Sequence, residues 1–145
     1  MADSIANPRL SLQDGVELVK TLKAMSYSID TPTAEKHNVF TVTQVSPSTF
    51  LEEFLGADFV QISANSISEI HKHQNSENVI LVLRGRATII LNDEEFTINA
   101  GNRVQIGRGV YHGFRTQAEQ LEFISIQMPP ILDKKKGIFD RIVKT

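Results

Sequence analysis

The sequence predicts an all-β protein, an antiparallel sandwich or barrel preceded by one helix. From about residue 38 onwards, short runs rich in Val, Ile, Phe and Thr follow one another, and these residue types favour strands. Turn residues such as Asn92-Asp93 and Gly107-Arg108-Gly109 separate the runs. No helical pattern lies between them, and closely spaced strands without intervening helices indicate antiparallel pairing rather than a parallel α/β sheet.

The expected strands cover residues 39–45, 59–63, 67–71, 79–83, 87–91, 95–98, 103–106 and 121–127. Before them, apolar residues recur at helical spacing, which predicts an amphipathic helix over residues 11–25; these are Leu12, Val16, Val19, Leu22 and Met25. Ser11 is a suitable N-cap for this helix. Gly15 within it costs about 1 kcal/mol relative to alanine, so the helix should depend on packing.

The strand pattern ends at Pro129-Pro130, because tandem prolines cannot donate to a sheet ladder. We therefore expect a helical arm over residues 1–37, a barrel over 38–128 and a short C-terminal tail over 129–145. The apolar residues of the tail should form a short amphipathic turn that docks on the barrel or on a second subunit; they are Ile138, Phe139, Ile142 and Val143.

Length and composition narrow the class of protein. A chain of 145 residues that is 41% hydrophobic can bury one sizeable core. Its 17 acidic and 15 basic residues give a net charge of -2, so nucleic acid is not an expected partner. No apolar run reaches the roughly 18 residues of a membrane span, and the first residues lack the pattern of a secretory signal, so a cytoplasmic location is expected.

Histidines carry the clearest chemical signal. His71 and His73 are two residues apart at the end of a predicted strand, so their side chains project from the same face. His112 follows a glycine-containing loop, and Glu77 comes shortly after the histidine pair. The chain has no cysteine, so imidazole and oxygen must supply any transition-metal ligands. One His-x-His alone is weak evidence, because half-exposed histidines at alternate strand positions are common.

Two longer stretches resemble the two conserved motifs of the cupin family. Residues 71–85 contain two histidines, a glutamate and a strand that ends at Gly85, as in the first cupin motif. Residues 101–112 run from a glycine to His112, as in the second. The resemblance implies a cupin-type antiparallel β-barrel, also called a double-stranded β-helix or jelly roll. It also implies one divalent transition metal (Zn, Fe, Mn or Ni) bound by His71, His73, Glu77 and His112.

The first motif departs from the family pattern at its glutamate. Counted back from Gly85, cupins usually place this residue one position later, where this chain has Asn78. A loop at residues 74–77 resets the strand alternation, so the sequence leaves open whether Glu77 or Asn78 faces the metal. With Asn78 inside, no anionic protein ligand remains, and the site resembles the three-histidine centres of some dioxygenase cupins.

Three further residues are candidates for contact with a small-molecule ligand. Gln61 is a polar residue at a predicted strand position, and Tyr111 and Phe114 flank His112. The alternatives are a solvent-facing glutamine and aromatic side chains that belong to the core. No catalytic residue can be named from the sequence.

The resemblance favours an enzyme that acts on a small oxygenated metabolite, such as a sugar, a sugar phosphate or a keto acid, by isomerase-type chemistry. Three alternatives stay open: an iron-dependent dioxygenase, a non-enzymatic module that binds a small ligand, and a metal-free epimerase that uses a histidine and a tyrosine. A homodimer is expected, because small cupins commonly pair and the apolar residues of the helix and tail need cover.

Overall fold

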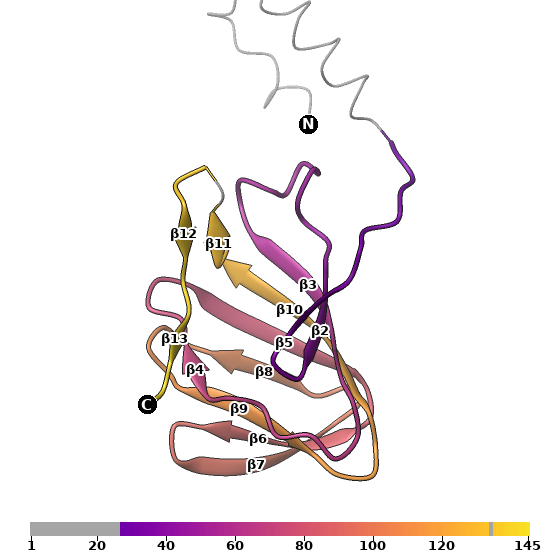
Figure 1. Cartoon of the computed structure of the whole chain (residues 1–145), viewed down its shortest axis with the longest axis vertical. Coiled ribbons are helices and arrows are strands. Elements are labelled where there is room, and N and C mark those ends of the chain that lie inside the picture. The colour runs from indigo at the N-terminus through magenta and orange to yellow at the C-terminus, as the bar shows by residue number, and fades with distance from the viewer. Residues whose placement is uncertain (1–26, 134) are drawn as a thin grey trace, which may run out of the picture. The chain divides into compact units, whose positions relative to one another are not determined.

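The computed structural model describes residues 27–133 and 135–145 (Figure 1). The chain divides into two compact units, Met1–Thr31 and Pro32–Thr145. Residues 27–31 of the first unit are exposed and lie outside helices and strands. The helix predicted over residues 11–25 falls outside the described residues.

Antiparallel sheets make up the second unit, which confirms the predicted all-β fold class. The larger sheet has six strands in the order β1-β2-β3-β10-β5-β8. Their bounds are Glu35–His37 (β1), Phe40–Gln44 (β2), Gly56–Ile62 (β3), Leu121–Met128 (β10), Glu77–Arg84 (β5) and Arg103–Ile106 (β8). Within residues 27–133 and 135–145 there is no helix and no segment able to cross a membrane as a helix.

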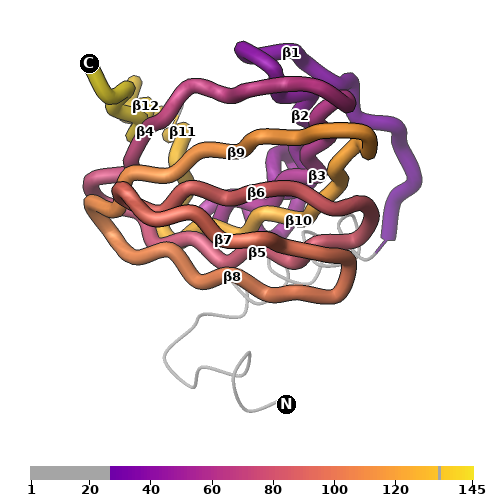
Figure 2. The backbone as a smooth tube through the Cα atoms, turned by 90° about the horizontal axis from the view of Figure 1, so that it is seen from below, coloured from indigo at the N-terminus to yellow at the C-terminus, as the bar shows by residue number. Residues whose placement is uncertain are grey.

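The second sheet has five strands in the order β13-β4-β9-β6-β7. They are Ile142–Val143 (β13), His71–Lys72 (β4), His112–Thr116 (β9), Arg86–Leu91 (β6) and Glu94–Asn99 (β7). Figure 2 shows β4, β9, β6 and β7 following one another across this sheet. A small two-stranded sheet pairs Leu132–Asp133 (β11) with Ile138–Phe139 (β12).

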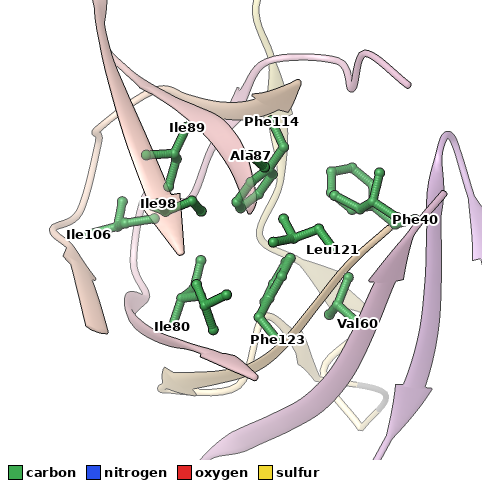
Figure 3. Close-up of a cluster of buried hydrophobic side chains, with 12 residues drawn as sticks. Phe40, Val60, Ile80, Ala87, Ile89, Ile98, Ile106, Phe114, Leu121 and Phe123 are labelled. Carbon is green, nitrogen blue, oxygen red and sulfur yellow. The ribbon is translucent and has the colours of Figure 1, made fainter. Parts of the chain in front are cut away.

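The core lies between the two main sheets, because alternate side chains of each strand point inward. In β5 and β10 buried and exposed residues alternate along the strand. Ile80 and Phe123 of the larger sheet thus meet Ile89 and Phe114 of the other sheet in one apolar cluster (Figure 3). The turn between β5 and β6 depends on Gly85, whose φ of 91° is open mainly to glycine.

The C-terminal segment is more closely integrated than the sequence suggested. Instead of a docked turn, Ile142 and Val143 form β13, in which they lie opposite Lys72 and His71 of β4. The backbone amide of Lys144 extends this pairing by donating to the carbonyl of Ile70 at 2.8 Å. At the other end, β1 already belongs to the larger sheet, although the sequence placed it in the N-terminal arm. Residues 142–144 therefore extend the sheet that carries the histidines.

Candidate metal centre

Strands β4 and β9 bring the three predicted histidines together. His71 lies directly opposite His112 in the β4–β9 pair, and His73 follows β4 two residues later. All three side chains are buried. One ring nitrogen from each lies within 4.8 Å of the others. Residues separated by about forty positions in the sequence thus form one cluster because the two strands are neighbours.

Backbone carbonyls orient two of the rings. The Nδ1 atom of His73 lies 2.6 Å from the carbonyl oxygen of Asp140, and Nδ1 of His112 lies 3.0 Å from the carbonyl oxygen of Val110. A carbonyl can only accept, so each Nδ1 carries the hydrogen and each Nε2 keeps its lone pair. This arrangement is typical of metal-binding histidines, whose second nitrogen is held by a hydrogen bond.

His71 fits a metal site for another reason. Its Nδ1 atom is the one fully buried side-chain polar atom of the described residues that has no hydrogen-bond partner. A buried polar atom without a partner costs about 1–3 kcal/mol, so such an atom calls for an explanation. A metal ion among three imidazoles would provide one, since neutral histidine nitrogens are common transition-metal ligands.

Burial keeps these histidines neutral. Burial, together with the neighbouring His112 and His73, lowers the pKa of His71 to about 3. Burial also lowers the pKa of His112 to about 4 against the opposing hydrogen bond to Val110. The pKa of His73 is lowered by burial as well. At neutral pH all three rings therefore have a lone pair available for a metal.

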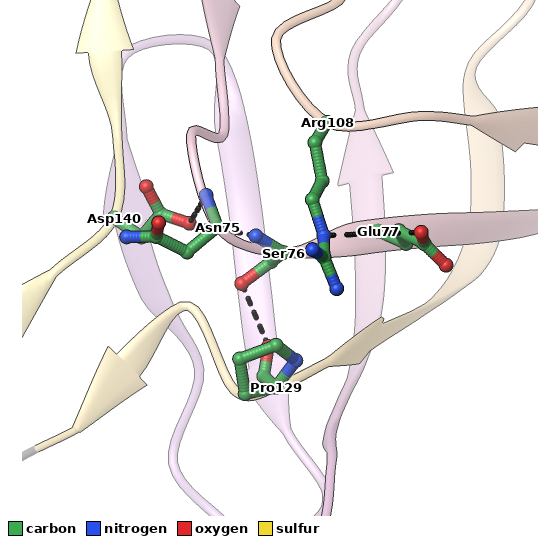
Figure 4. A network of polar contacts seen from close by, with 6 residues as sticks. All are labelled: Asn75, Ser76, Glu77, Arg108, Pro129 and Asp140. Atoms are coloured by element: carbon green, nitrogen blue, oxygen red, sulfur yellow. Dashed lines mark hydrogen bonds and ion pairs between the residues drawn. The ribbon is translucent and has the colours of Figure 1, made fainter.

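Asp140 supports the site from the C-terminal segment. Its carboxylate accepts hydrogen bonds from the backbone amides of Gln74 and Asn75 at 2.8 Å and of Ser76 at 2.9 Å. Figure 4 shows Asp140 beside Asn75 and Ser76. Burial alone would raise the pKa of Asp140, but these amides outweigh it and lower the pKa. The side chain thus anchors the loop after His73, while the carbonyl of the same residue orients the His73 ring.

Glu77 does not join the histidines, which corrects its prediction as a metal ligand. Its side chain is 61% exposed and pairs with Arg108 across 3.8 Å on the outer surface (Figure 4). The physical reason is strand parity: β5 begins at Glu77, so Glu77 points outward and Asn78 points inward, where it is 5% exposed. The metal-ligand cluster found in the described residues therefore contains histidines alone.

The three residues predicted to contact a ligand have different surroundings. Phe114 is buried, lines the cavity beside the histidines and stacks on Phe123 at a centroid distance of 5.0 Å. Gln61 is on the outward-facing side of β3 and is not part of the cavity wall. Tyr111 also lies outside the cavity, and its ring is contacted by the ammonium groups of Lys72 and Lys144.

The cavity has a volume of about 970 Å³ and reaches from the histidines to the inner face of the larger sheet. Its apolar lining includes Phe40, Val60, Ile80, Phe114 and Phe123. The larger sheet adds four polar side chains to the cavity wall: Asp58, Asn78, Ser125 and Gln127. Of these, the sequence had singled out only Asn78, as the alternative to Glu77 for facing the metal. Gln127 was recognisable as a polar strand residue, but the sequence could not show that its side chain faces inward.

Comparison with known proteins identifies the fold. The model of the cupin domain matches residues 58–127. No curated protein matches the chain in sequence. Among solved structures, a variant of Pac13 from Streptomyces with uridine superposes with a TM-score of 0.65 at 11% identity, covering 82% of this chain and 89% of that one. Pac13 is described as a nucleoside dehydratase.

Two further structures have the same barrel. The plu4264 protein from Photorhabdus luminescens gives a TM-score of 0.61 at 20% identity, covering 77% of this chain and 89% of that one. A formate complex of oxalate decarboxylase from Lactobacillus farciminis gives 0.63 at 18% identity, covering 77% of this chain and 33% of that one. Identities this low establish the fold and not the activity. Together with the domain match and the two motifs, they show that the chain contains a cupin domain over residues 58–127 and has the cupin-type barrel fold.

Proposed function

We propose that this protein is a metal-dependent enzyme that acts on a small oxygenated metabolite inside the barrel. The observation that carries the proposal is the convergence of three buried, neutral imidazoles on the wall of a cavity of about 970 Å³. His71, His73 and His112 would hold one divalent transition metal, Zn, Fe, Mn or Ni. Such a metal would act as a Lewis acid on a carbonyl or hydroxyl group.

The cavity supports a small ligand rather than a macromolecule. Its volume lies within the range of about 300–1,000 Å³ typical of small-molecule sites. Apolar walls with a few polar groups are also typical of such sites. Pac13 with uridine and oxalate decarboxylase with formate are examples of cupin barrels that bind small oxygenated molecules. Isomerase-type chemistry on a sugar, sugar phosphate or keto acid is the reaction class we propose.

An iron-dependent dioxygenase is the second candidate. It is favoured by the absence of a carboxylate from the metal-ligand cluster of the described residues. A site with three protein ligands leaves positions for both a substrate and oxygen. The metal found in the purified protein separates the two candidates, because only the dioxygenase requires iron.

The remaining alternatives are less well supported. A metal-free epimerase would pair a histidine with a tyrosine, but within Pro32–Thr145 the one tyrosine is Tyr111, which lies outside the cavity. A non-enzymatic module that binds a small ligand would have the same metal site, so it is distinguished by binding without turnover.

Elemental analysis of protein purified without a histidine tag tests the proposal. We expect about one transition metal per chain in the wild type and none in a His71→Ala/His73→Ala double variant. Iron would favour the dioxygenase, whereas zinc, manganese or nickel would favour the isomerase. A wild type that contains no metal, and takes up none of these ions when they are added, contradicts the metal-dependent function.

We further propose that two copies pair through the outer face of β5 and β10. These neighbouring strands expose a group of large apolar side chains: Val79, Leu81, Leu83, Ile126 and Met128. Adjacent exposed apolar side chains on a sheet are typical of an interaction surface, and a second copy would satisfy it symmetrically. The cytoplasmic location stays a prediction from the sequence, which cell fractionation would test.

A further inference from the structure

The polar residues of the larger sheet lie at one end of the barrel interior. In β3 and β10, Asp58 is directly opposite Ser125. In β10 and β5, Gln127 is directly opposite Asn78. The inward residues next along these strands are apolar, with Phe123 opposite Val60. Strand register therefore gathers four inward polar side chains at the cavity end, away from the apolar core.

Hydrogen bonds connect these four side chains into one chain of contacts. The Gln127 amide nitrogen donates to Asp58 Oδ2 at 3.0 Å and to Ser125 Oγ at 2.7 Å. Ser125 in turn donates to Asn78 Oδ1 at 2.9 Å. Both hydrogens of the Gln127 amide are thus used, and each contact has a defined direction.

The two side chains at the ends of this hydrogen-bonded series, Asp58 and Asn78, face the cavity. No side-chain hydrogen bond among the described residues uses the second oxygen of Asp58 or the amide nitrogen of Asn78. In the described part of the chain, the one fully buried side-chain polar atom without a hydrogen-bond partner is His71 Nδ1. The free atoms of Asp58 and Asn78 are therefore not fully buried. Both residues line the cavity, so these atoms are accessible from it. One wall thus offers an acceptor at Asp58 and a donor at Asn78.

In the described part of the chain, Asp58 has no partner cation of the kind that a purely structural buried carboxylate usually has. Among the described residues it forms no salt bridge, and its one side-chain partner is the neutral Gln127. Burial raises the pKa of Asp58, against the opposing hydrogen bond from Gln127. A desolvated carboxylate costs stability unless it is paired, so this position is not explained by folding.

Gly56 shows that the neighbouring strand leaves room for the arrangement. A Cβ atom at this position would collide with Oε1 of Gln127, whose side chain is 2% exposed. The Gln127 amide can therefore lie where it reaches Asp58 only because residue 56 has no side chain. Several residues on three strands cooperate to present the Asp58 carboxylate to the cavity.

We propose that Asp58, Gln127, Ser125 and Asn78 form a binding subsite for a neutral hydroxyl-bearing molecule, a sugar or polyol, whose hydroxyl donates to Asp58 while another oxygen accepts from Asn78. This inference rests on the proposed function, because the histidine site on the facing sheet would hold another oxygen of the same molecule. The unpaired carboxylate repels an acid placed against this wall. Among the proposed substrates, the subsite therefore selects a neutral sugar over a keto acid.

The variant Asp58→Asn tests the direction of this hydrogen bond. The Gln127 amide still needs an acceptor, so the new side chain would turn its oxygen to Gln127 and its NH₂ group to the cavity. The ligand-facing atom changes from an acceptor to a donor. We expect glucose and xylose to bind the variant about 10- to 100-fold more weakly than the wild type, and gluconate and xylonate to bind it more tightly.

Binding would be measured by calorimetry on metal-loaded protein with these four compounds. Glu95→Gln is the matched control, because it makes the same chemical change at an exposed side chain paired with Arg115 outside the cavity. The control should bind all four compounds as the wild type does. Unchanged preference in a folded Asp58→Asn protein overturns the subsite, as does a wild type that binds neither glucose nor xylose.

Two readouts keep this test separate from the metal proposal. The metal content of Asp58→Asn should equal that of the wild type, so full metal content with unchanged sugar preference refutes the subsite alone. Loss of metal from the wild type would refute the proposed function instead. If thermal melting shows that Asp58→Asn is unfolded, Asp58→Ser serves in its place, with the expected result of weaker sugar binding and no gain for the acids.

Discussion

Glu77 and Asn78, the first two residues of β5, point to opposite faces of the strand, Glu77 to the exposed face and Asn78 into the cavity. The motif spacing placed the three histidines correctly in one cluster. It could not decide between Glu77 and Asn78, because the direction of a side chain depends on where β5 begins after the loop. Asp58 was missed altogether, since its importance comes from contacts with residues about seventy positions away.

Titration of the histidines leads to a prediction about the stability of the metal-free protein. The pKa values of His71 and His112 are about 3 and about 4 in the folded protein, compared with 6.5 for a free histidine. Between these values the unfolded chain binds more protons than the folded protein does. The contribution of the neutral histidines to the free energy of unfolding is therefore fully present above pH 6.5 and is lost as the pH falls towards 4. We expect a loss of a few kcal/mol over this window.

Chemical denaturation of the metal-free protein at a series of pH values measures this loss. The His71→Ala/His73→Ala double variant is the comparison, because it removes two of the buried rings. Its stability should depend less steeply on pH over the same window. Equal slopes for the two proteins would mean that the buried histidines do not govern the acid sensitivity.

Asp58 should make stability depend on pH in the opposite direction. Its folded pKa is raised above 3.8, so its contribution to stability is present below that pH and is lost as the pH rises through the folded pKa. At neutral pH Asp58→Asn should therefore melt at a higher temperature than the wild type, with the advantage disappearing in acid. A lower melting temperature at neutral pH would show that the carboxylate stabilises the fold, as a structural group would.

At the scale of elements, strands with clear alternation were predicted, whereas β9 and the two-residue strands β11, β12 and β13 were not. Burial alternates over residues 77–83 of β5 and along all of β10, which is the signal that sequence patterns detect. β9 was missed because four of its five residues are buried, including Gly113, so no alternation is visible. β11, β12 and β13 have two residues each, too few for any period. β11 and β12 pair with each other, and β13 is positioned by pairing with the distant β4.

The C-terminal segment should therefore contribute to metal binding through Asp140. In Asp140→Ala the loop after His73 loses the acceptor of three backbone amides. The carbonyl that orients His73 would then be less firmly held. We expect metal affinity to fall about 10- to 100-fold, as is common when a group that supports a ligand is removed.

Competition with a chromophoric chelator would measure this affinity. Asp133→Ala is the matched control, because Asp133 accepts a backbone amide of the same segment, that of Lys136, without contacting His73. The control should keep the wild-type affinity. Equal losses in both variants would indicate general destabilisation of the segment rather than positioning of His73.

At the scale of the whole barrel, the two ends of the interior serve different purposes. Close-packed apolar side chains such as Ile62 and Leu121, both fully buried, hold the sheets together at one end. At the other end, stability is lowered by the buried histidines and by the Asp58 carboxylate, whose one side-chain partner among the described residues is the neutral Gln127. A rigid barrel tolerates such groups because the rest of the core compensates, and it keeps them in position for a ligand.

The outer surface leads to the last prediction, the oligomeric state. Leu81 and Ile126 are 43% and 42% exposed on neighbouring strands, and burying them against a second copy would contribute to association. Light scattering should therefore give the mass of a dimer at micromolar concentration, and Leu81→Lys should raise the dissociation constant at least about tenfold. Phe96→Lys is the control, because Phe96 is similarly exposed but lies on β7 of the other sheet. A monomeric wild type would leave this apolar face without the proposed partner, whereas a dimer that only Phe96→Lys disrupts would move the interface to the sheet that carries the histidines.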